Sequence, residues 1–218
     1  MSKKPLLIIG YNRSSKITNL LNIVITNPSI SKIYIKIDGP KNHKDNEEIL
    51  LIKTIIKNFK KKKSQIIAKF ENKNLGLQKN IISAINWVFL KEKDLIILED
   101  DNVPSKDFFN FCSKMLDTYK NSKKIMHISG TNFNKSFNRD DYYFSKMPDI
   151  VGWATWKNKW NKLVNKFDLS LIIKNNVVKN YYEFDERICH WFYEYLYREV
   201  NSKKNHNLWS TWWQLTII

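Results

Sequence analysis

Three consecutive acidic residues, Glu99, Asp100 and Asp101, have the types and spacing that metal chemistry requires, and they directly follow an apolar run. Adjacent carboxylates repel one another, and a hard divalent cation with oxygen ligands would remove this repulsion. The same cation would bridge to phosphate oxygens and neutralise the charge that develops on a leaving diphosphate. Alternatively, the acids would only complement the dipole of a helix that begins near Ser105. We favour the first interpretation and predict a metal site at this triplet.

Short apolar runs alternate with helical patterns along residues 1–130, and these elements would position the triplet. Continuous apolar runs are typical of buried parallel strands, and apolar residues three and four apart are typical of amphipathic helices. We predict strands over residues 5–9, 32–37, 64–70, 94–98 and 125–129, and helices after Ser14 or Ser15, over residues 47–59 and 77–89, and after Ser105. This alternation predicts an α/β fold with a mostly parallel sheet and right-handed crossovers.

Four loops follow the predicted strands and carry polar residues or glycine. They comprise residues 10–13, 38–39, 72–76 and 99–101. Ligands of open α/β sheets bind beyond the carboxyl ends of the strands, which share one edge of the sheet. We therefore expect these four loops to form one site.

Several segments resemble nucleotide-diphospho-sugar transferases of the GT-A fold. The longest, from Asn74 to Tyr119, reads NLGLQKNIISAINWVFLKEKDLIILEDDNVPSKDFFNFCSKMLDTY. The stretches LLIIGYNR and GWATWKNKW, and the Asp38-Gly39 pair, fit the same family. The likeness is greatest to N-acetylglucosaminyltransferase-I-like enzymes and related bacterial glycosyltransferases. It implies a Rossmann-like single domain in which residues 1–130 bind the nucleotide sugar and residues 131–218 form an aromatic-rich acceptor side.

This resemblance also implies an activity and a metal. The family transfers a sugar from a nucleotide sugar, here expected to be a UDP-sugar, to a glycan or a lipid-linked glycan, as in polysaccharide biosynthesis. It implies a hexosyltransferase that uses Mn²⁺ or Mg²⁺. By the match of motifs, Asp101 would be the direct metal ligand and Asp100 would approach the ribose.

Further nucleotide contacts are implied in the loops after the first three strands. Tyr11, Arg13 and Asp38 would contact the base. Arg13 could instead be a surface residue ahead of a helix, and Asp38 could instead form a turn with Gly39. Asn74 and Gly76 would line the nucleotide or would only shape their turn. A glycine at position 76 would also let the backbone approach a ligand closely.

The tryptophans of the GWATWKNKW stretch divide between two roles. Trp153, Trp156 and Trp160 lie three and four residues apart, which predicts one face of a helix. We expect Trp156 and Trp160 to pack in the core. Gly152 and Trp153, at the start of the stretch, are the candidates for contact with a sugar or the acceptor.

The family pattern lacks one group that the transfer step requires. An inverting enzyme needs a carboxylate base to deprotonate the acceptor hydroxyl, and related enzymes carry it in a late tryptophan-rich segment. Here that position holds Ser210 and Thr211, whose hydroxyl pKa lies far above neutrality. Possible substitutes are Asp140, Asp141, Asp149 and Glu183. The catalytic base is therefore unknown.

Two alternatives to an active glycosyltransferase stay open, and the first of them follows from the missing base. The chain would be a catalytically inactive remnant that still binds nucleotide sugar, or a sugar nucleotidyltransferase, although residues 10–13 match the loop of the latter poorly. The chain ends at Ile218 within an apolar run. We therefore expect its C-terminal part to be incomplete.

Composition limits the partners and the location. The net charge is +16, but only four of the 37 basic residues are arginine, the residue that specific nucleic-acid readout favours. We predict a solvated basic surface and no nucleic-acid partner, with peripheral contact to anionic lipid as the next interpretation. No signal peptide and no apolar stretch of spanning length occur. We expect a cytoplasmic protein that can contact the inner face of the membrane.

Overall fold

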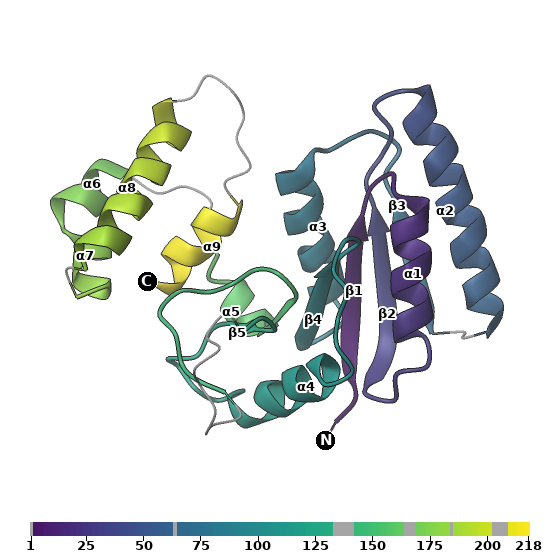
Figure 1. Ribbon diagram of the computed structural model, residues 1–218, viewed down its shortest axis with the longest axis horizontal. Coiled ribbons are helices and arrows are strands. Elements are labelled where there is room, and N and C mark those ends of the chain that lie inside the picture. Colours follow the sequence, from purple (N-terminus) through teal and green to yellow (C-terminus); the bar gives the residue numbers. More distant parts are fainter. Residues whose placement is uncertain (1, 63–64, 133–141, 164–168, 184, 202–208) are drawn as a thin grey trace. The chain divides into compact units, whose positions relative to one another are not determined.

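The computed structural model describes residues 2–62, 65–132, 142–163, 169–183, 185–201 and 209–218 (Figure 1). Its chain divides into two compact units. The first, here called the sheet unit, comprises Met1–Phe133 and Asp149–Trp160. The second, the helical unit, comprises Asn134–Pro148 and Asn161–Ile218. The sheet unit thus includes the short segment Asp149–Trp160, which is separated in sequence from the rest of that unit.

The sheet unit is built on six strands in the order β3-β2-β1-β4-β6-β5. The strands are β1 (Lys4–Gly10), β2 (Ile30–Ile37), β3 (Ile66–Phe70), β4 (Asp94–Glu99), β5 (Ile128–Ser129) and β6 (Trp153–Trp156). Strands β1 to β4 pair with one another in parallel, and β6 pairs antiparallel with both β4 and β5. The predicted α/β fold with a mostly parallel sheet is confirmed.

Helices cover both faces of this sheet. They are α1 (Ser14–Val24), α2 (His43–Lys62), α3 (Leu77–Phe89), α4 (Phe108–Thr118) and the short α5 (Lys157–Trp160). Helices α1 and α2 lie on one face and α3 lies on the other (Figure 1). This is the layering that right-handed crossovers produce when the chain first winds from β1 to β3 and then returns to β4.

The core follows from the apolar runs. In β1 every residue is buried, because the strand lies in the middle of the sheet with helices above and below.

Helix α2 begins four residues before the predicted start, since the side chain of Asn42 accepts a hydrogen bond of 2.9 Å from the amide of Asp45. Such a cap satisfies one of the free amides of a first helical turn.

The expectation that Trp153, Trp156 and Trp160 share one helical face is wrong. Trp153 and Trp156 belong to β6, and only Trp160 lies in α5. Pairing with β4 makes this segment extended, with Trp153 opposite Ile97. A spacing of three then places the two side chains on opposite faces of the strand. All three rings are buried, so Trp156 and Trp160 pack in the core as expected.

The helical unit contains α6 (Leu169–Lys174), α7 (Val177–Tyr181), α8 (Glu186–Asn201) and α9 (Trp209–Ile217). Its own apolar cluster comprises Ile172, Val178, Tyr182, Cys189, Phe192, Leu196 and Leu215. Gln214 on α9 donates a hydrogen bond of 3.0 Å to the hydroxyl of Tyr182, which ties α9 to this cluster. Among the described residues, no helix combines the length and the apolar character needed to span a membrane.

His127, in the sheet unit, gives the fold a specific pH dependence. Its Nε2 donates a hydrogen bond of 2.8 Å to the carbonyl oxygen of Asp149, and its ring stacks on Trp153 at 4.9 Å. Burial lowers the pKa of His127 from 6.5 to about 4, although the bond to Asp149 opposes this shift. Because the unfolded chain binds the proton more readily, stability is present above pH 6.5 and is lost as pH falls towards 4.

We expect this loss to reach up to about 3 kcal/mol of unfolding free energy between pH 6.5 and pH 4. Urea unfolding across that range would measure it. His127→Gln keeps a side chain that can donate to Asp149 but does not titrate, so its stability should depend less on pH by this amount. An equal pH dependence in the variant and the wild type would contradict the assignment.

Candidate functional site

The candidate site lies where the strand order reverses. The chain passes from β1 outwards to β2 and β3 and then crosses to β4 on the other side of β1. The amide of Asp38 donates to the carbonyl oxygen of Gly10, and that of Asp100 donates to Ile9, each at 3.0 Å. The loops after β1, β2 and β4 therefore leave the sheet side by side. Open α/β sheets bind their ligands at such a point.

The three acids differ in their exposure. The side chain of Asp100 is 1 % exposed, whereas that of Asp101 is 50 % exposed. Burial raises the pKa of Glu99, and the negative charges of Asp101 and Asp100 raise it further. Burial also raises the pKa of Asp100, and the guanidinium of Arg13 opposes this shift. Asp101 is thus the carboxylate that is open to a ligand.

Arg13 contacts two of the acids. Its Nη2 forms an ion pair with Oδ1 of Asp100, and its Nη1 lies 3.2 Å from Oδ2 of Asp101. The interacting residues are separated by almost ninety positions in sequence. The arginine therefore lies at the site and is not a free surface residue.

Gly10 makes room for the buried acid. A Cβ atom added at Gly10 would lie 3.1 Å from Oδ2 of Asp100 and 2.9 Å from Cδ1 of Ile17. The next amide, that of Tyr11, lies 3.4 Å from the same carboxylate oxygen. A glycine at the end of β1 thus allows Asp100 to approach the backbone of the first loop.

Tyr11 and Asn12 are held by Asp45, a residue that the sequence did not indicate as part of the site. The Tyr11 hydroxyl donates to Oδ2 of Asp45, and Nδ2 of Asn12 donates to Oδ1 at 2.6 Å. The amide of Lys41 donates to Oδ2 at 3.0 Å. Burial and the bond to Asp45 raise the pKa of Tyr11 to about 12. The only local sign of Asp45 was its place one turn after Asn42.

Asp38 joins the loops after β2 and β3. Its Oδ1 accepts hydrogen bonds from the amides of Gly39 and Leu75 at 2.9 and 2.8 Å. Its Oδ2 accepts from the amide of Gly76 and from Nδ2 of Asn74, both at 3.1 Å. A carboxylate offers about four lone-pair positions, so these donors occupy all of them. Asp38, Asn74 and Gly76 do come together, as parts of one hydrogen-bonded loop pair.

Two positions in this loop pair require glycine, one because of a close backbone contact and the other because of its backbone conformation. A Cβ atom on Gly39 would overlap the backbone of Lys73, so only glycine permits this close approach. Gly76 has a φ of 78° and a ψ of 160°, a conformation essentially restricted to glycine. An added Cβ there would meet no atom within 4 Å. The backbone at Gly76, just before α3, is therefore open.

The donor set fits a divalent metal through Asp101. Asp101 offers hard carboxylate oxygens at a half-exposed position, and three acids face one arginine at this edge. Among the described residues, however, no three acidic, histidine or cysteine side chains converge as a complete metal cage. A metal bound through one or two carboxylates would take its other ligands from phosphate and water, which is the usual pattern for Mg²⁺.

Gly152 and Trp153 lie in the sheet unit and make packing contacts. Gly152 has a φ of 64°, and its carbonyl oxygen accepts a hydrogen bond of 2.8 Å from the amide of Gly130. Trp153 is 2 % exposed and is covered by His127 on one side. These contacts favour a structural role for Trp153.

The structure describes four of the six residues that were named for the position of the catalytic base or as substitutes for it. Thr211 is buried in α9, and Ser210 beside it is half-buried. One side-chain oxygen of Asp149 accepts from the amide of Val151 and the other is buried, while Glu183 forms an ion pair with Lys146. Asp140 and Asp141 lie outside the described residues.

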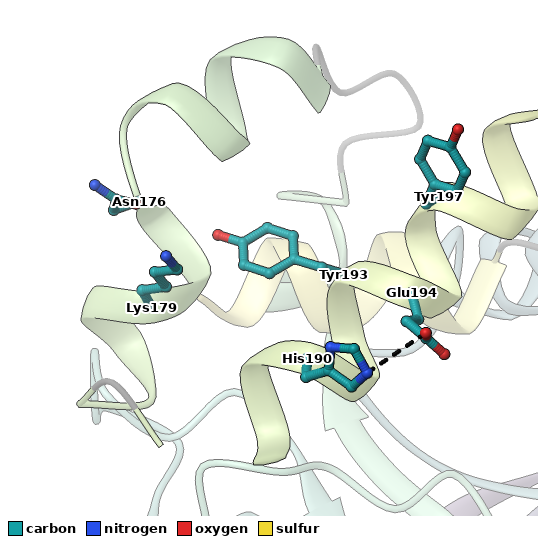
Figure 2. A pocket seen from close by; sticks show the side chains of 6 residues that line it. All are labelled: Asn176, Lys179, His190, Tyr193, Glu194 and Tyr197. Carbon is teal, nitrogen blue, oxygen red and sulfur yellow. Dashed lines mark ion pairs between the residues drawn. The ribbon is translucent and has the colours of Figure 1, made fainter. Parts of the chain in front are cut away.

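A separate hollow of about 380 Å³ lies between α7 and α8 in the helical unit (Figure 2). Its lining residues are Asn176, Lys179, His190, Tyr193, Glu194 and Tyr197. His190 and Glu194 are one turn apart on α8, and Nε2 of His190 lies 3.4 Å from Oε1 of Glu194. The walls combine aromatic rings with single charged groups of both signs.

The fold and this edge of the sheet define a class: an α/β protein with a Rossmann-like first half and a group of acidic residues at its strand-order reversal. No family model and no curated protein matches the chain. Solved structures that resemble it include a mannosyltransferase from Pyrobaculum calidifontis in complex with GDP-Man and Mn²⁺, and 4-diphosphocytidyl-2C-methyl-D-erythritol synthase from Anaerococcus prevotii.

The extent of these likenesses is limited. The mannosyltransferase is 13 % identical with a TM-score of 0.43, over 59 % of this chain and 35 % of its own. This chain thus spans about a third of the mannosyltransferase. The synthase is 15 % identical with a TM-score of 0.44, over 84 % of both chains.

Proposed function

We propose that this protein is a metal-dependent glycosyltransferase that uses a nucleotide sugar, with a UDP-sugar as the donor. The observation that carries the proposal is the arrangement of Asp100, Asp101 and Arg13 at the strand-order reversal. A half-exposed carboxylate next to a guanidinium can hold both a divalent cation and a diphosphate. Sites of this type in α/β sheets are suited to nucleotides.

Each residue has a proposed task. Asp101 would hold the divalent metal, Mn²⁺ or Mg²⁺, which neutralises charge on the leaving diphosphate. Arg13 would supply a second positive charge to the phosphates, because its guanidinium is planar and always protonated. Tyr11 would offer its ring to the base, and Asp100 would approach the ribose. The open backbone at Gly76 would allow the nucleotide to lie close to the start of α3.

Asp38 and Asn74 have a positioning task in this proposal. Since the carboxylate of Asp38 already accepts four hydrogen bonds, a contact with the base would require the loss of one of them. Both residues therefore act by fixing the loops that border the nucleotide.

The acceptor is proposed to be a glycan or a lipid-linked glycan. The net charge of +16 would favour approach to an anionic lipid surface. Deprotonation of the acceptor hydroxyl needs a base that Ser210 and Thr211 cannot supply. The proposal therefore assigns donor binding to named residues and leaves the base unassigned.

Calorimetry with UDP tests donor binding directly. We expect UDP to bind in the presence of Mn²⁺ and much more weakly with chelator. UDP binding that does not depend on metal, or no binding of UDP and GDP alike, would contradict the proposal.

A turnover assay then separates the enzyme from its alternatives. We expect release of UDP from a UDP-sugar, by hydrolysis or by transfer to a glycan acceptor. Release of pyrophosphate from UTP and a sugar phosphate would instead identify a nucleotidyltransferase. Binding without turnover of any donor would identify an inactive remnant.

A further inference from the structure

The carboxylates at the strand-order reversal have an internal positive partner. Arg13 bridges Asp100, whose side chain is 1 % exposed, and Asp101, whose side chain is 50 % exposed. Its own side chain is 46 % exposed, so the guanidinium stays in contact with solvent. One cation thus lies against the carboxylate at which the proposed function requires a divalent metal.

The place of Arg13 in the chain is electrostatically unusual. It is the N-cap residue of α1, makes no side-chain capping bond, and is followed by a first turn without acidic residues. A positive charge is disfavoured at a helix N-terminus, where the backbone dipole is itself positive. The acids after β4 therefore hold the guanidinium in this position, since the helix does not.

Metal and guanidinium compete for the same oxygen atoms. A cation on Asp101 would cancel the attraction that holds Nη1 of Arg13, and the positive charge of the metal would repel the guanidinium. Arg13 would then need another anionic partner, and a diphosphate next to the metal would provide one.

We propose that Arg13 is an internal counter-cation, which holds Asp101 in the metal-free protein and is exchanged for the divalent metal when a diphosphate ligand binds. This inference rests on the proposed function for the metal and the diphosphate. It makes two statements beyond that function. The metal alone binds weakly because it must displace Arg13, and UDP strengthens metal binding by giving Arg13 a new partner.

Titration of Mn²⁺, followed by the electron paramagnetic resonance signal of the free ion, tests the inference without turnover. Affinities are measured without nucleotide and with saturating UDP, for the wild type and for Arg13→Gln. The matched control is Lys16→Gln, which removes the same charge from an exposed position one turn further along α1. Arg13→Lys keeps the charge but cannot span both carboxylates.

Without nucleotide, Arg13→Gln is expected to bind Mn²⁺ roughly fivefold more tightly than the wild type, because no ion pair must be broken. The Mn²⁺ affinity of Arg13→Lys should lie between those of the wild type and Arg13→Gln, and the Mn²⁺ affinity of Lys16→Gln should equal that of the wild type. The factor by which UDP strengthens Mn²⁺ binding should be smaller in Arg13→Gln by a similar amount.

Two results would overturn the inference, and only the second would also contradict the proposed function. If Arg13→Gln binds Mn²⁺ no more tightly than Lys16→Gln, Arg13 is not a competing cation, and the proposed function is unaffected. If the wild type binds no Mn²⁺ even with UDP present, the proposed function fails and the exchange fails with it.

Discussion

Replacement of Asp101 by asparagine is expected to lower the affinity for UDP in the presence of Mn²⁺ by on the order of 100-fold. The amide is uncharged, so it neither binds a hard cation well nor helps to hold a metal–diphosphate pair. Because Asp101 is half-exposed and, among the described residues, forms an ion pair with Arg13 alone, the fold should tolerate the change. Calorimetry of UDP with Mn²⁺, together with thermal unfolding, measures both effects.

Asp107→Asn is the matched control for this prediction. Asp107 is exposed and is the N-cap residue of α4, without a side-chain capping bond, so its replacement makes the same change of charge at a residue that has no task in the proposed site. We expect its UDP affinity to equal that of the wild type. Wild-type affinity in Asp101→Asn would exclude Asp101 as the metal ligand, and equal losses in both variants would indicate a general effect of charge.

Replacement of Asp38 by asparagine is expected to destabilise the fold by about 3 kcal/mol, because one carboxylate oxygen becomes a donor that faces other donors. Oδ1 accepts from two amides and Oδ2 accepts from an amide and the side chain of Asn74, so neither orientation of the new amide satisfies its neighbours. Asp38 is 4 % exposed, which limits replacement of these bonds by water. Urea unfolding at neutral pH measures the loss.

Asn74→Ala is the control for Asp38. It removes one donor to Oδ2 and the bond to the carbonyl oxygen of Gly39, but leaves the backbone amides paired. We expect it to cost about 1 kcal/mol. If Asp38→Asn is as stable as the wild type but no longer binds UDP, Asp38 contacts the nucleotide directly and its positioning role is wrong.

The sequence predicted the first half of the fold in detail because local patterns dominate there. The helix over Leu77–Phe89 has the predicted bounds, and each of the first four strands lies within two residues of its expected limits where the chain is described. A buried parallel strand is apolar throughout and an amphipathic helix repeats every three or four residues, so both can be recognised without knowing their partners.

The loops of the site were predictable for a related reason. In a parallel sheet, alternation of strands and helices places every loop that follows a strand on one edge. The proximity of residues 10–13, 38–39 and 99–101 is therefore contained in the order of the elements. The resemblance to GT-A enzymes added roles for individual residues, and these roles remain proposals.

Other features depend on partners that are distant in sequence. The GWATWKNKW stretch has helical spacing, but hydrogen bonds to β4 make its first part a strand. Asp45 belongs to the site because its carboxylate meets Tyr11 and Asn12 across 34 and 33 positions. No local pattern encodes such contacts.

The acidic triplet shows the same division within three residues. Its position after an apolar strand, and hence its place at the edge of the sheet, could be read from the sequence alone. Only the tertiary structure decided that Asp100 is buried against Arg13 and that Asp101 is left half-exposed. The physical reason is that exposure and pairing depend on the neighbours which the sheet brings together, and not on the residue types themselves.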